Sequence, residues 1–430
     1  MRVRFAPAPS NNLHIGNIKA LILNWIYAQK QNGSLLLRID DTQNTNNNNI
    51  NSIHDICQWL NIKPAYTFKQ SDRKTIYKQY FEILKQNNII YPCYETKDEL
   101  KKNTNHVYKK TNNNIYNNST PTYYRFQLQA NNTTYNDAIQ GEKEINIAHI
   151  SDPIVYITAS NQFTYLFASS ADDIHENITH VIRGNDHITN TFIQQQIMQS
   201  IIIFSHKTSH KLPQFAHYGL FLSSETKEKL SKRKGDSFTE HIKTNILPIA
   251  LIKYIINSGV AKNMNINKNH ELHEIIDFLE LSNLSNNNII YDEQMLLTIN
   301  KNYLQNMSHK QIQSIIPNID LFTWQLIQHN ISTINDITKW QIILNIDNNN
   351  STTDNEQHIT ILSSILNIID ISKSNTENFT LCKEQLGNKF FKPLRLCLTN
   401  QLNGPMIIDI FNFFPLNKII QRIKKYCNIS

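Results

Sequence analysis

The chain has 430 residues, more than one hydrophobic core usually supports, so we expect two to four domains of ~100–200 residues each. Hydrophobic residues make up 40%, and no run approaches the ~20 apolar residues of a membrane helix, which argues against a membrane protein. The N-terminal MRVRFAPAPS lacks the apolar stretch of a signal peptide, and five scattered cysteines predict no disulfide framework. We therefore expect a soluble, cytoplasmic protein with no membrane partner.

Charge and glycine content say less about function. The formal net charge is +7, from 42 Lys and Arg against 35 Asp and Glu, which suits an anionic partner but is equally expected of a basic protein without one. Glycine is scarce, with 9 in 430 residues against a usual ~7%, and asparagine tracts recur. We expect the remaining glycines to stand where a side chain would not fit.

The N-terminal segment predicts a parallel β-α-β unit. Arg2–Phe5 alternates polar and apolar residues as a short strand does, and apolar residues every three or four positions from Ile18 predict a helix that Gly33 ends. Ser34–Asp40 then has the pattern of a buried strand. Ligands of such sheets bind beyond the carboxyl ends of the strands, where Asp40 and the loop after the first strand are expected to lie.

The rest of the chain predicts an interrupted sheet followed by helices. A polar loop is expected over 44–49, and a helix over 76–86 leads into a mixed, polar stretch over about 90–160. The sheet resumes after this insertion, with strands predicted over 161–168, 180–184 and 214–222. From Ile242 onward the pattern is mostly helical.

The first motif with chemical content lies where the first helix begins. RFAPAP at 4–9 is followed by LHIGN at 13–17. A helix N-terminus offers unpaired N–H groups and partial positive charge, which favour a phosphate. His14 can donate to a phosphate oxygen, and Gly16 removes a Cβ where a nucleobase could lie against the backbone. The residues HIGN alone would equally suit an ordinary helix start.

The second motif is a cationic loop. KLSKRKG at 229–235 gathers three lysines and an arginine beside Ser231 and Gly235, which suits a polyphosphate. On its own, such a run is more often a solvated basic loop or a weak nucleic-acid patch.

The two motifs together are far more specific. HIGN near the N-terminus and KLSKR about 215 residues later resemble the two signatures of the class I aminoacyl-tRNA synthetases. Further blocks stand in family order: VRFAPAPSNNLHIGN, LLLRIDDT, YPCYETKDEL, HVIRGNDHITNT, FAHYGLFLSSETKEKLSKRKG and FFKPLRLCLTNQLNGP. They extend over residues 3–405, and in them the chain is similar to the bacterial-type glutamyl-tRNA synthetases.

This resemblance implies an α/β catalytic domain of the class I Rossmann type, split by an α+β insertion and followed by an all-α anticodon-binding region. The expected domains are the first catalytic half over 1–80, the inserted domain for the tRNA acceptor end over 81–160, the second catalytic half over 161–222, a stem-contact region with the KLSKR loop over 223–300, and the helical anticodon-binding domain over 301–430. A monomer is expected.

The resemblance also implies a two-step reaction with ATP, L-glutamate and tRNA(Glu). The glutamate carboxylate attacks the α-phosphate of ATP, and the terminal ribose of tRNA then takes the acyl group from the glutamyl-adenylate. The catalytic residues would be His14, Gly16, Lys229 and Lys232, with the lysines neutralising the pyrophosphate. ATP would be held by Pro7, His14, Gly16, Asn17, Lys229, Leu230, Ser231, Lys232 and Arg233.

Five residues match the glutamate pocket of the family: Arg4, Ala6, Asp40, Tyr165 and Arg183. Arg4 and Arg183 would recognise carboxylates, since a guanidinium pairs with them bidentately. Asp40 would bind the α-ammonium, and Tyr165 would line the pocket. The alternatives are an ion pair of Arg183 with Asp186 at the strand end and plain core packing of Tyr165.

Metal ions are expected only with the nucleotide. Some relatives carry a zinc site in the inserted domain, but Cys93 and His106 do not supply the four ligands that structural zinc needs, so we predict no zinc. Mg²⁺ is expected to accompany ATP, and no dedicated protein cage for it can be identified.

The C-terminal helices are expected to contact tRNA phosphates. The candidates are Lys389, Lys392, Arg395, Lys418, Arg422, Lys424 and Lys425. For any single one of them a solvated helix face is the alternative.

Departures from the family pattern leave other functions open. The family's RIEDT is RIDDT here, so the acid at Asp40 is one methylene shorter, and Ala8 and Thr158 replace a serine and a common basic residue. Such changes suit a specialised or non-discriminating duplicate that glutamylates tRNA(Gln). A catalytically silent tRNA-binding paralogue is an alternative of another class, against which the retained His14 and Lys232 argue. A glutaminyl-tRNA synthetase would have β-barrels in its C-terminal half, and a truncated tRNA-modifying paralogue would lack that half.

Overall fold

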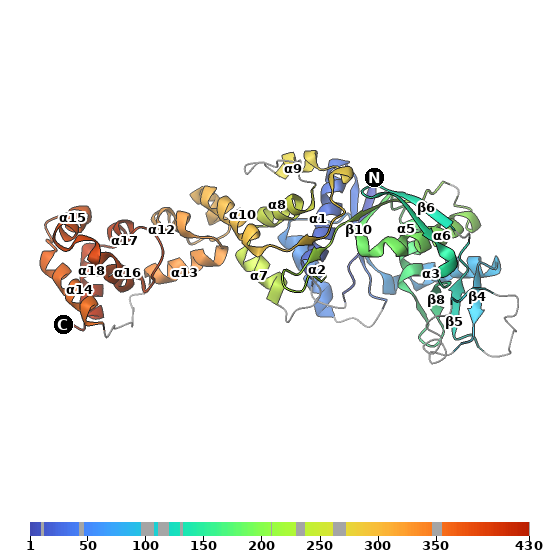
Figure 1. Ribbon diagram of the computed structural model, residues 1–430, viewed down its shortest axis with the longest axis horizontal. Helices are drawn as coiled ribbons and strands as arrows, with labels where there is room; N and C mark the ends of the chain where they lie inside the picture. Colours follow the sequence, from blue (N-terminus) through green and yellow to red (C-terminus); the bar gives the residue numbers. More distant parts are fainter. Residues whose placement is uncertain are drawn as a thin grey trace. The chain divides into compact units, whose positions relative to one another are not determined.

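The computed structural model describes residues 1–9, 13–42, 47–95, 107–110, 120–129, 132–207, 209–228, 237–260, 272–345 and 355–429. The chain divides into two compact units (Figure 1). The first unit holds Met1–His241 and Ile252–Asp292, and the second holds Ile242–Leu251 and Glu293–Ser430. Every strand among the described residues belongs to the first unit.

The N-terminal elements form the predicted β-α-β unit. They are β1 (Arg2–Phe5), α1 (Ile15–Lys30), β2 (Ser34–Ile39), α2 (Asn47–Trp59) and β3 (Tyr66–Lys69). The three strands are parallel, in the order β1-β2-β3. β1 and β2 are buried along nearly their whole length, as a parallel sheet covered on both faces requires.

Helix α2 is missing from the sequence-based prediction. The polar loop expected over 44–49 is wrong in its described part, because α2 already begins at Asn47. Ile50, Ile53 and Ile56 recur every three residues and are buried, so one apolar stripe holds the helix on the protein. The periodic signal was present, but the asparagine tract before it concealed where the helix starts.

The second parallel pair follows the insertion. Its elements are α5 (Tyr165–His175), β10 (His180–Gly184), α6 (Ile188–Phe204), β11 (Gln214–Tyr218) and β12 (Phe221–Leu222). β10 and β11 are parallel, and the Thr179 N–H donates to the Arg2 carbonyl (2.9 Å), which places β10 beside β1. The sheet thus resumes after the insertion, as predicted.

The strand predicted over 161–168 is wrong. Only Gln162 and Phe163 are extended as β9, and Thr164 (φ −77°, ψ 161°) precedes helix α5, which begins at Tyr165. Every residue from Phe167 to Ile174 is buried, so this helix shows no polar face. A short run buried on all sides cannot be assigned to helix or strand from periodicity alone.

The insertion is an antiparallel sheet with a separate hairpin. Its elements are β4 (Ile90–Cys93), β5 (Tyr123–Phe126), β6 (Asn132–Asp137), β7 (Gly141–Asn146), β8 (Ile154–Ile157) and β9 (Gln162–Phe163), after helix α3 (Lys74–Gln86). The sheet order is β4-β5-β8-β9, and β6 pairs with β7. The Ala138 N–H donates to the Phe215 carbonyl (2.8 Å), so the hairpin adjoins β11.

The remaining elements are helical except for one short strand. They are α7 (Ser237–Asn245), α8 (Pro248–Gly259), α9 (Leu272–Phe278), β13 (Ile289–Ile290), α10 (Glu293–Asn306), α11 (His309–Gln313), α12 (Leu321–Ile327), α13 (Ile334–Asn345), α14 (Glu356–Ile368), α15 (Asn375–Leu386), α16 (Phe391–Thr399), α17 (Ile407–Phe413) and α18 (Leu416–Tyr426). In the second unit Trp324, Phe390 and Phe411 are buried, and they give it a core of its own. The predicted fold class, a parallel-sheet α/β domain with an α+β insertion and a helical C-terminal region, is confirmed.

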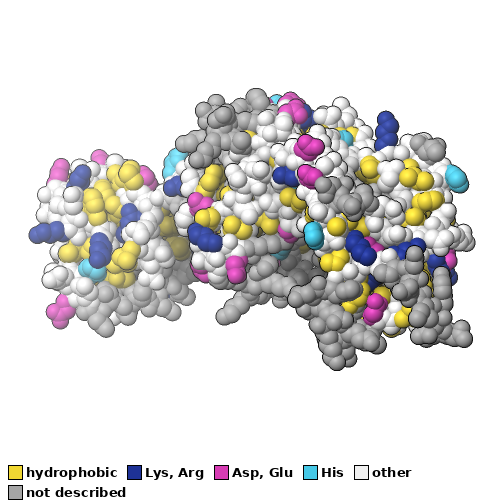
Figure 2. Space-filling model, turned by 45° about the vertical axis from the view of Figure 1, so that its right-hand side comes forward, with side chains coloured by type: hydrophobic (Ala, Val, Ile, Leu, Met, Phe, Trp, Pro, Cys, Tyr) yellow, Lys and Arg dark blue, Asp and Glu magenta, His cyan; other side chains and the backbone are white. Residues whose placement is uncertain are grey.

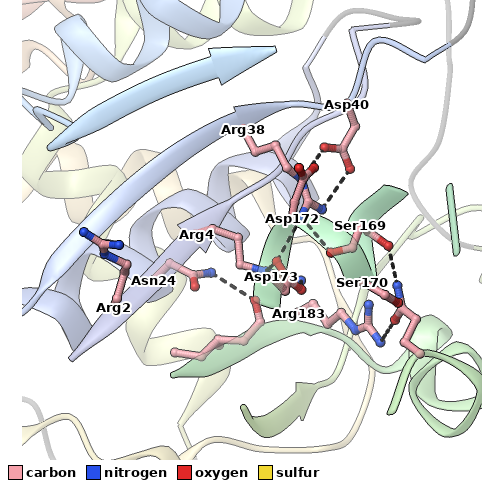
Figure 3. A network of polar contacts seen from close by, with 12 residues as sticks. Arg2, Arg4, Asn24, Arg38, Asp40, Ser169, Ser170, Asp172, Asp173 and Arg183 are labelled. Atoms are coloured by element: carbon pink, nitrogen blue, oxygen red, sulfur yellow. Dashed lines mark hydrogen bonds and ion pairs between the residues drawn. The ribbon is translucent and has the colours of Figure 1, made fainter. Parts of the chain in front are cut away.

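A buried ionic cluster joins β1 and β2 to α5 (Figure 3). Arg38 is 1% exposed, and it bonds Asp40 through Nε (2.6 Å) and Asp173 through NH1 (2.9 Å). Asp173 also pairs with Arg4 (3.1 Å), and Asp172 pairs with Arg73 (3.1 Å). Burial alone would lower the pKa of Arg38, but the surrounding carboxylates outweigh it and raise that pKa well above its ordinary value.

Substituting Arg38 with methionine tests how far this cluster stabilises the first unit. Arg38→Met leaves Asp40 and Asp173 without their shared cation, and we expect a loss of about 3–5 kcal/mol in the free energy of unfolding, measured by urea denaturation. Arg2→Met is the control: Arg2 also bonds α5, but its side chain is 42% exposed, so the loss should stay below about 1 kcal/mol. Equal denaturation midpoints for the two variants would contradict the role of the cluster.

Candidate active site

A cavity of about 170 Å³ lies at the carboxyl ends of β1, β10 and β11. It brings together eight residues that the sequence predicted for the site: Arg4, Ala6, Pro7, His14, Gly16, Asn17, Tyr165 and Arg183. Asp40 is adjacent to the cavity but does not line it. Its N–H donates to the Pro7 carbonyl (3.0 Å), and its carboxylate bonds Arg38. The remaining predicted residues, Lys229, Leu230, Ser231, Lys232 and Arg233, lie outside the described residues.

The N-terminus of α1 forms one wall of the cavity. His14 is the N-cap residue, and its Nδ1 accepts the Gly16 N–H (3.1 Å) while the Asn17 side chain accepts the His14 N–H (3.1 Å). With Nδ1 accepting, the ring proton of His14 is on Nε2, where it can be donated to an anion. A Cβ at Gly16 would come within 2.9 Å of the His14 ring, so a larger residue there would displace the imidazole from this position.

Arg183 forms the other wall and pairs with no carboxylate among the described residues. Its side chain is 7% exposed, and Nε donates to His217 Nε2 (3.2 Å) while NH2 donates to Thr191 (2.6 Å) and Gln194 (2.7 Å). NH1 contacts only the Tyr165 hydroxyl, at 3.5 Å, within the described part of the chain. Burial lowers the pKa of Arg183, as expected for a cation removed from water without a counter-ion.

The two arginines of the site therefore differ in charge compensation. Arg4 is neutralised by Asp173, whereas Arg183 makes no ion pair among the described residues, and the alternative pair with Asp186 is not formed. A buried guanidinium without a carboxylate is costly unless a ligand supplies one. The arrangement suits a carboxylate bound at Arg183 next to a phosphate bound at the start of α1.

Comparison with known proteins agrees with this chemistry. Residues 1–305 match the family of class I tRNA synthetases (E and Q), catalytic domain. The chain belongs to this family. It is 31% identical to glutamate–tRNA ligase 1 of Wolbachia sp. subsp. Brugia malayi, over 99% of this chain and 100% of that protein. It is 29% identical to glutamate–tRNA ligase 2 of Bartonella henselae, over 98% and 99% of the two chains.

The fold of the synthetase agrees with solved structures. A glutamate tRNA ligase from Elizabethkingia meningosepticum, in complex with its amino acid, superimposes with a TM-score of 0.78 at 23% identity, over 99% of both chains. The glutamate-tRNA synthetase from Elizabethkingia anophelis gives the same values. Together with the family match, these comparisons confirm the resemblance to glutamyl-tRNA synthetases, which are ligases.

Sequence reasoning missed one buried basic residue that lines the cavity of the synthetase. Lys19 lines the cavity and is 1% exposed; its Nζ donates to the Gly219 carbonyl (2.7 Å) and lies 4.9 Å from the ring centroids of both Tyr218 and Phe221. Burial lowers its pKa to about 7. Lys19 lies on the apolar face of α1, four residues after Ile15. A lysine on the apolar face of a helix is the sequence feature that could have indicated this buried basic residue.

Asp186 and His187 also line the cavity, in the turn after β10. Both belong to the block HVIRGNDHITNT. Sequence reasoning considered Asp186 only as a partner of Arg183 and missed His187. Asp186 is the single carboxylate among the described lining residues, which also include Arg4, Lys19 and Arg183.

A second cavity, of about 600 Å³, lies between α3 and the β5-β8-β9 strands. Lys74, Lys78 and Lys85 line it, together with aromatic rings. The ammonium of Lys85 lies 5.1 Å from the ring centroid of Tyr124, and the Thr158 hydroxyl is buried without a hydrogen-bond partner in the described structure. Ammonium groups beside aromatic faces suit the phosphates and bases of an unpaired nucleic-acid strand.

The C-terminal candidates for tRNA contact differ in exposure. Lys392 on α16 and Lys424 on α18 are exposed, and Arg395 donates to the Pro405 carbonyl (2.7 Å). Arg422 is 7% exposed and bonds the Leu398 carbonyl, so its prediction as a phosphate contact is wrong: it packs inside the second unit. On the face in Figure 2, basic and acidic side chains are dispersed rather than gathered in one basic patch.

The described residues contain no candidate metal site and no helix that could span a membrane. No group of three or more His, Cys, Asp and Glu side chains there could hold a metal ion. Cys93 bonds Glu95, and the five cysteines are buried thiols that form no disulfide with one another. Within the same residues no helix has the length and apolarity needed to cross a bilayer.

The buried Lys19 should make stability depend on pH. Its pKa is about 7 in the folded protein and 10.5 ordinarily, so between these values the unfolded chain binds more protons and stability rises with pH. We expect Lys19→Met to be more stable than the wild type at about pH 6, and the difference to narrow by about 2 kcal/mol toward pH 8.5, in urea denaturation. Lys30→Met, on the same helix, is the control; a difference for Lys19→Met that is constant with pH would contradict the burial of this charge.

Proposed function

We propose that the synthetase ligates L-glutamate to tRNA(Glu) through a glutamyl-adenylate, with ATP as the co-substrate. The observation that carries this proposal is the buried, uncompensated guanidinium of Arg183 in a cavity whose other wall is the N-terminus of α1. The chain's relatives named glutamate–tRNA ligases support it. We also propose that the protein acts as a cytoplasmic monomer.

In the proposed complex, one carboxylate of glutamate pairs with NH1 of Arg183, next to the Tyr165 hydroxyl. Arg4 and the Ala6 backbone complete this side of the pocket, with Arg4 held in place by Asp173. Asp40 would bind the α-ammonium, and its carboxylate would then be shared with Arg38. The other glutamate carboxylate is left to react.

ATP would be placed with its phosphates at the start of α1. The N–H groups there and Nε2–H of His14 would bind phosphate oxygens, with Pro7, Gly16 and Asn17 beside them. A glutamate carboxylate oxygen attacks the α-phosphorus, and pyrophosphate leaves with the bonding electron pair. Lys229 and Lys232, with Leu230, Ser231 and Arg233 of the same loop, would neutralise the leaving group. No protein nucleophile is needed, because positioning and charge neutralisation carry this chemistry.

Mg²⁺ would enter with ATP. Asp186 is the one carboxylate among the described lining residues, and one carboxylate plus substrate phosphates is a usual environment for Mg²⁺. The ion, when bound, would neutralise phosphate charge. We propose no zinc site.

Removing Arg183 tests the glutamate site. We expect Arg183→Ala to lower kcat/KM for glutamate roughly 10²–10³-fold while the Kd for ATP stays within a few-fold, because only the carboxylate loses its partner. Arg183→Lys keeps the charge without the planar fork, so its kcat/KM for glutamate should lie between those of the wild type and Arg183→Ala. Steady-state aminoacylation and ATP titration give these values. An equal loss for glutamate and ATP would show that the role assigned to Arg183 is wrong.

The second cavity supports a contact with tRNA. Lys74 and Lys78 of the cavity are exposed, so a phosphate can reach them. We expect Lys74→Ala/Lys78→Ala to weaken tRNA binding about five- to tenfold near physiological salt and to reduce the salt slope by about two. Lys63→Ala, an exposed lysine outside the cavity, is the matched control. A salt slope unchanged in the double variant would exclude this contact.

Charging assays separate the remaining candidates. Transfer of glutamate to purified tRNA(Gln) as well as tRNA(Glu) would identify a non-discriminating or specialised enzyme. Folded protein that binds tRNA but neither charges it nor exchanges pyrophosphate with ATP would be a silent paralogue, and the proposed reaction would be wrong.

A further inference from the structure

The hairpin of the insertion brings a carboxylate to a buried histidine of the sheet. Asp137, at the end of β6, is 3% exposed, and its Oδ2 lies 2.6 Å from Nδ1 of His217, which is 0% exposed. The other oxygen, Oδ1, accepts the N–H groups of His217 (3.1 Å), Ile139 (3.0 Å) and Gln140 (3.0 Å). The carboxylate is therefore fixed in position by four hydrogen bonds.

These contacts determine which nitrogen of His217 carries the proton. Burial would raise the pKa of Asp137, but the hydrogen bonds from His217 and the backbone outweigh it and lower that pKa, so the carboxylate is ionised and accepts Nδ1–H. Burial in turn lowers the pKa of His217, which keeps the ring neutral. Nε2 then has a lone pair that can accept a hydrogen bond.

Arg183 and Thr191 both contact that nitrogen. His217 and Arg183 are register partners on β11 and β10, and the Nε–H of Arg183 donates to Nε2 at 3.2 Å. The Thr191 hydroxyl of α6 is 3.0 Å from the same nitrogen and accepts from NH2 of Arg183 (2.6 Å). Gln194 accepts a further bond from NH2 (2.7 Å).

We propose that Asp137 and His217 are positioning residues for the substrate-binding guanidinium of Arg183, an inference that rests on the proposed function. The acceptor that contacts Arg183 is the neutral ring of His217, and the negative charge of the pair stays on Asp137, on the far side of that ring. Nε and NH2 are thereby held against the protein, and NH1 is left toward Tyr165 and the cavity. A carboxylate in direct contact with Arg183 would then come from the substrate.

Asp137→Asn separates this role from simple packing. The amide oxygen can keep the three N–H bonds of Oδ1, but the amide nitrogen then faces Nδ1 of His217 and donates to it. The ring proton is forced onto Nε2, where it opposes the Nε–H of Arg183. We expect the KM for glutamate to rise about tenfold with kcat and the KM for ATP nearly unchanged, since one hydrogen bond to the arginine is lost.

His217→Gln provides the rescue. A glutamine oxygen can occupy the place of Nε2 and accept from Arg183 without any help from Asp137 in choosing a tautomer. The double variant Asp137→Asn/His217→Gln should therefore bind glutamate several-fold better than Asp137→Asn alone, whereas a structural role predicts that the two losses add. Asp72→Asn, an exposed acid in the same unit, is the control.

The tautomer itself can be measured without activity. ¹⁵N-histidine NMR of the wild type, with His217→Gln to assign the signal, should show a neutral His217 protonated on Nδ1. Protonation on Nε2 in the wild type would overturn the inference even if a variant misfolds, as would an unchanged glutamate KM in folded Asp137→Asn. Absence of glutamate charging by the wild type would instead refute the proposed function.

Discussion

Three buried arginines differ in whether a carboxylate of the protein pairs with them, and the site depends on this difference. Arg4, Arg38 and Arg183 are 5%, 1% and 7% exposed, and all three belong to neighbouring parallel strands. Asp173 of α5 pairs with the first two, while Arg183 donates to uncharged acceptors in the described part of the chain. Burying a charge without a partner destabilises the free protein. A ligand carboxylate offsets that cost, so binding and charge compensation become the same event.

The neutral surroundings of Arg183 are built from distant parts of the chain. His217 comes from β11, Thr191 from α6 and Tyr165 from α5, and Asp137 reaches His217 from the inserted hairpin. The insertion thus does more than interrupt the sheet, because one of its carboxylates fixes a ring beside Arg183. The acids on α5 meanwhile hold Arg4 and Arg38 and are kept from Arg183.

Sequence reasoning succeeded where a feature depends on neighbouring residues. β1, β2 and the start of α1 follow from local alternation and from the HIGN motif, and Arg183 was found because it stands in a recognisable block. It failed where a partner is remote: Asp137 and His217 are 80 residues apart, and nothing in either segment indicates the other. The start of α5 has the sequence pattern of a strand, because burial on every side removes the alternation of apolar and polar residues that marks a helix.

The same charge arrangement gives a physical basis for choosing glutamate over glutamine under the proposed function. An amide at NH1 of Arg183 would supply a dipole where the cavity offers an uncompensated cation, and the buried charge would remain unpaired. Sites built around a polar partner can reject an analogue that lacks it by ~10⁴–10⁵-fold, far more than a missing methylene achieves. Lys19, whose pKa burial lowers to about 7, lines the same cavity, and Asp186 is the one carboxylate among the described lining residues. An amino acid with two carboxylates, beside a triphosphate, is the substrate pair that such a cavity neutralises.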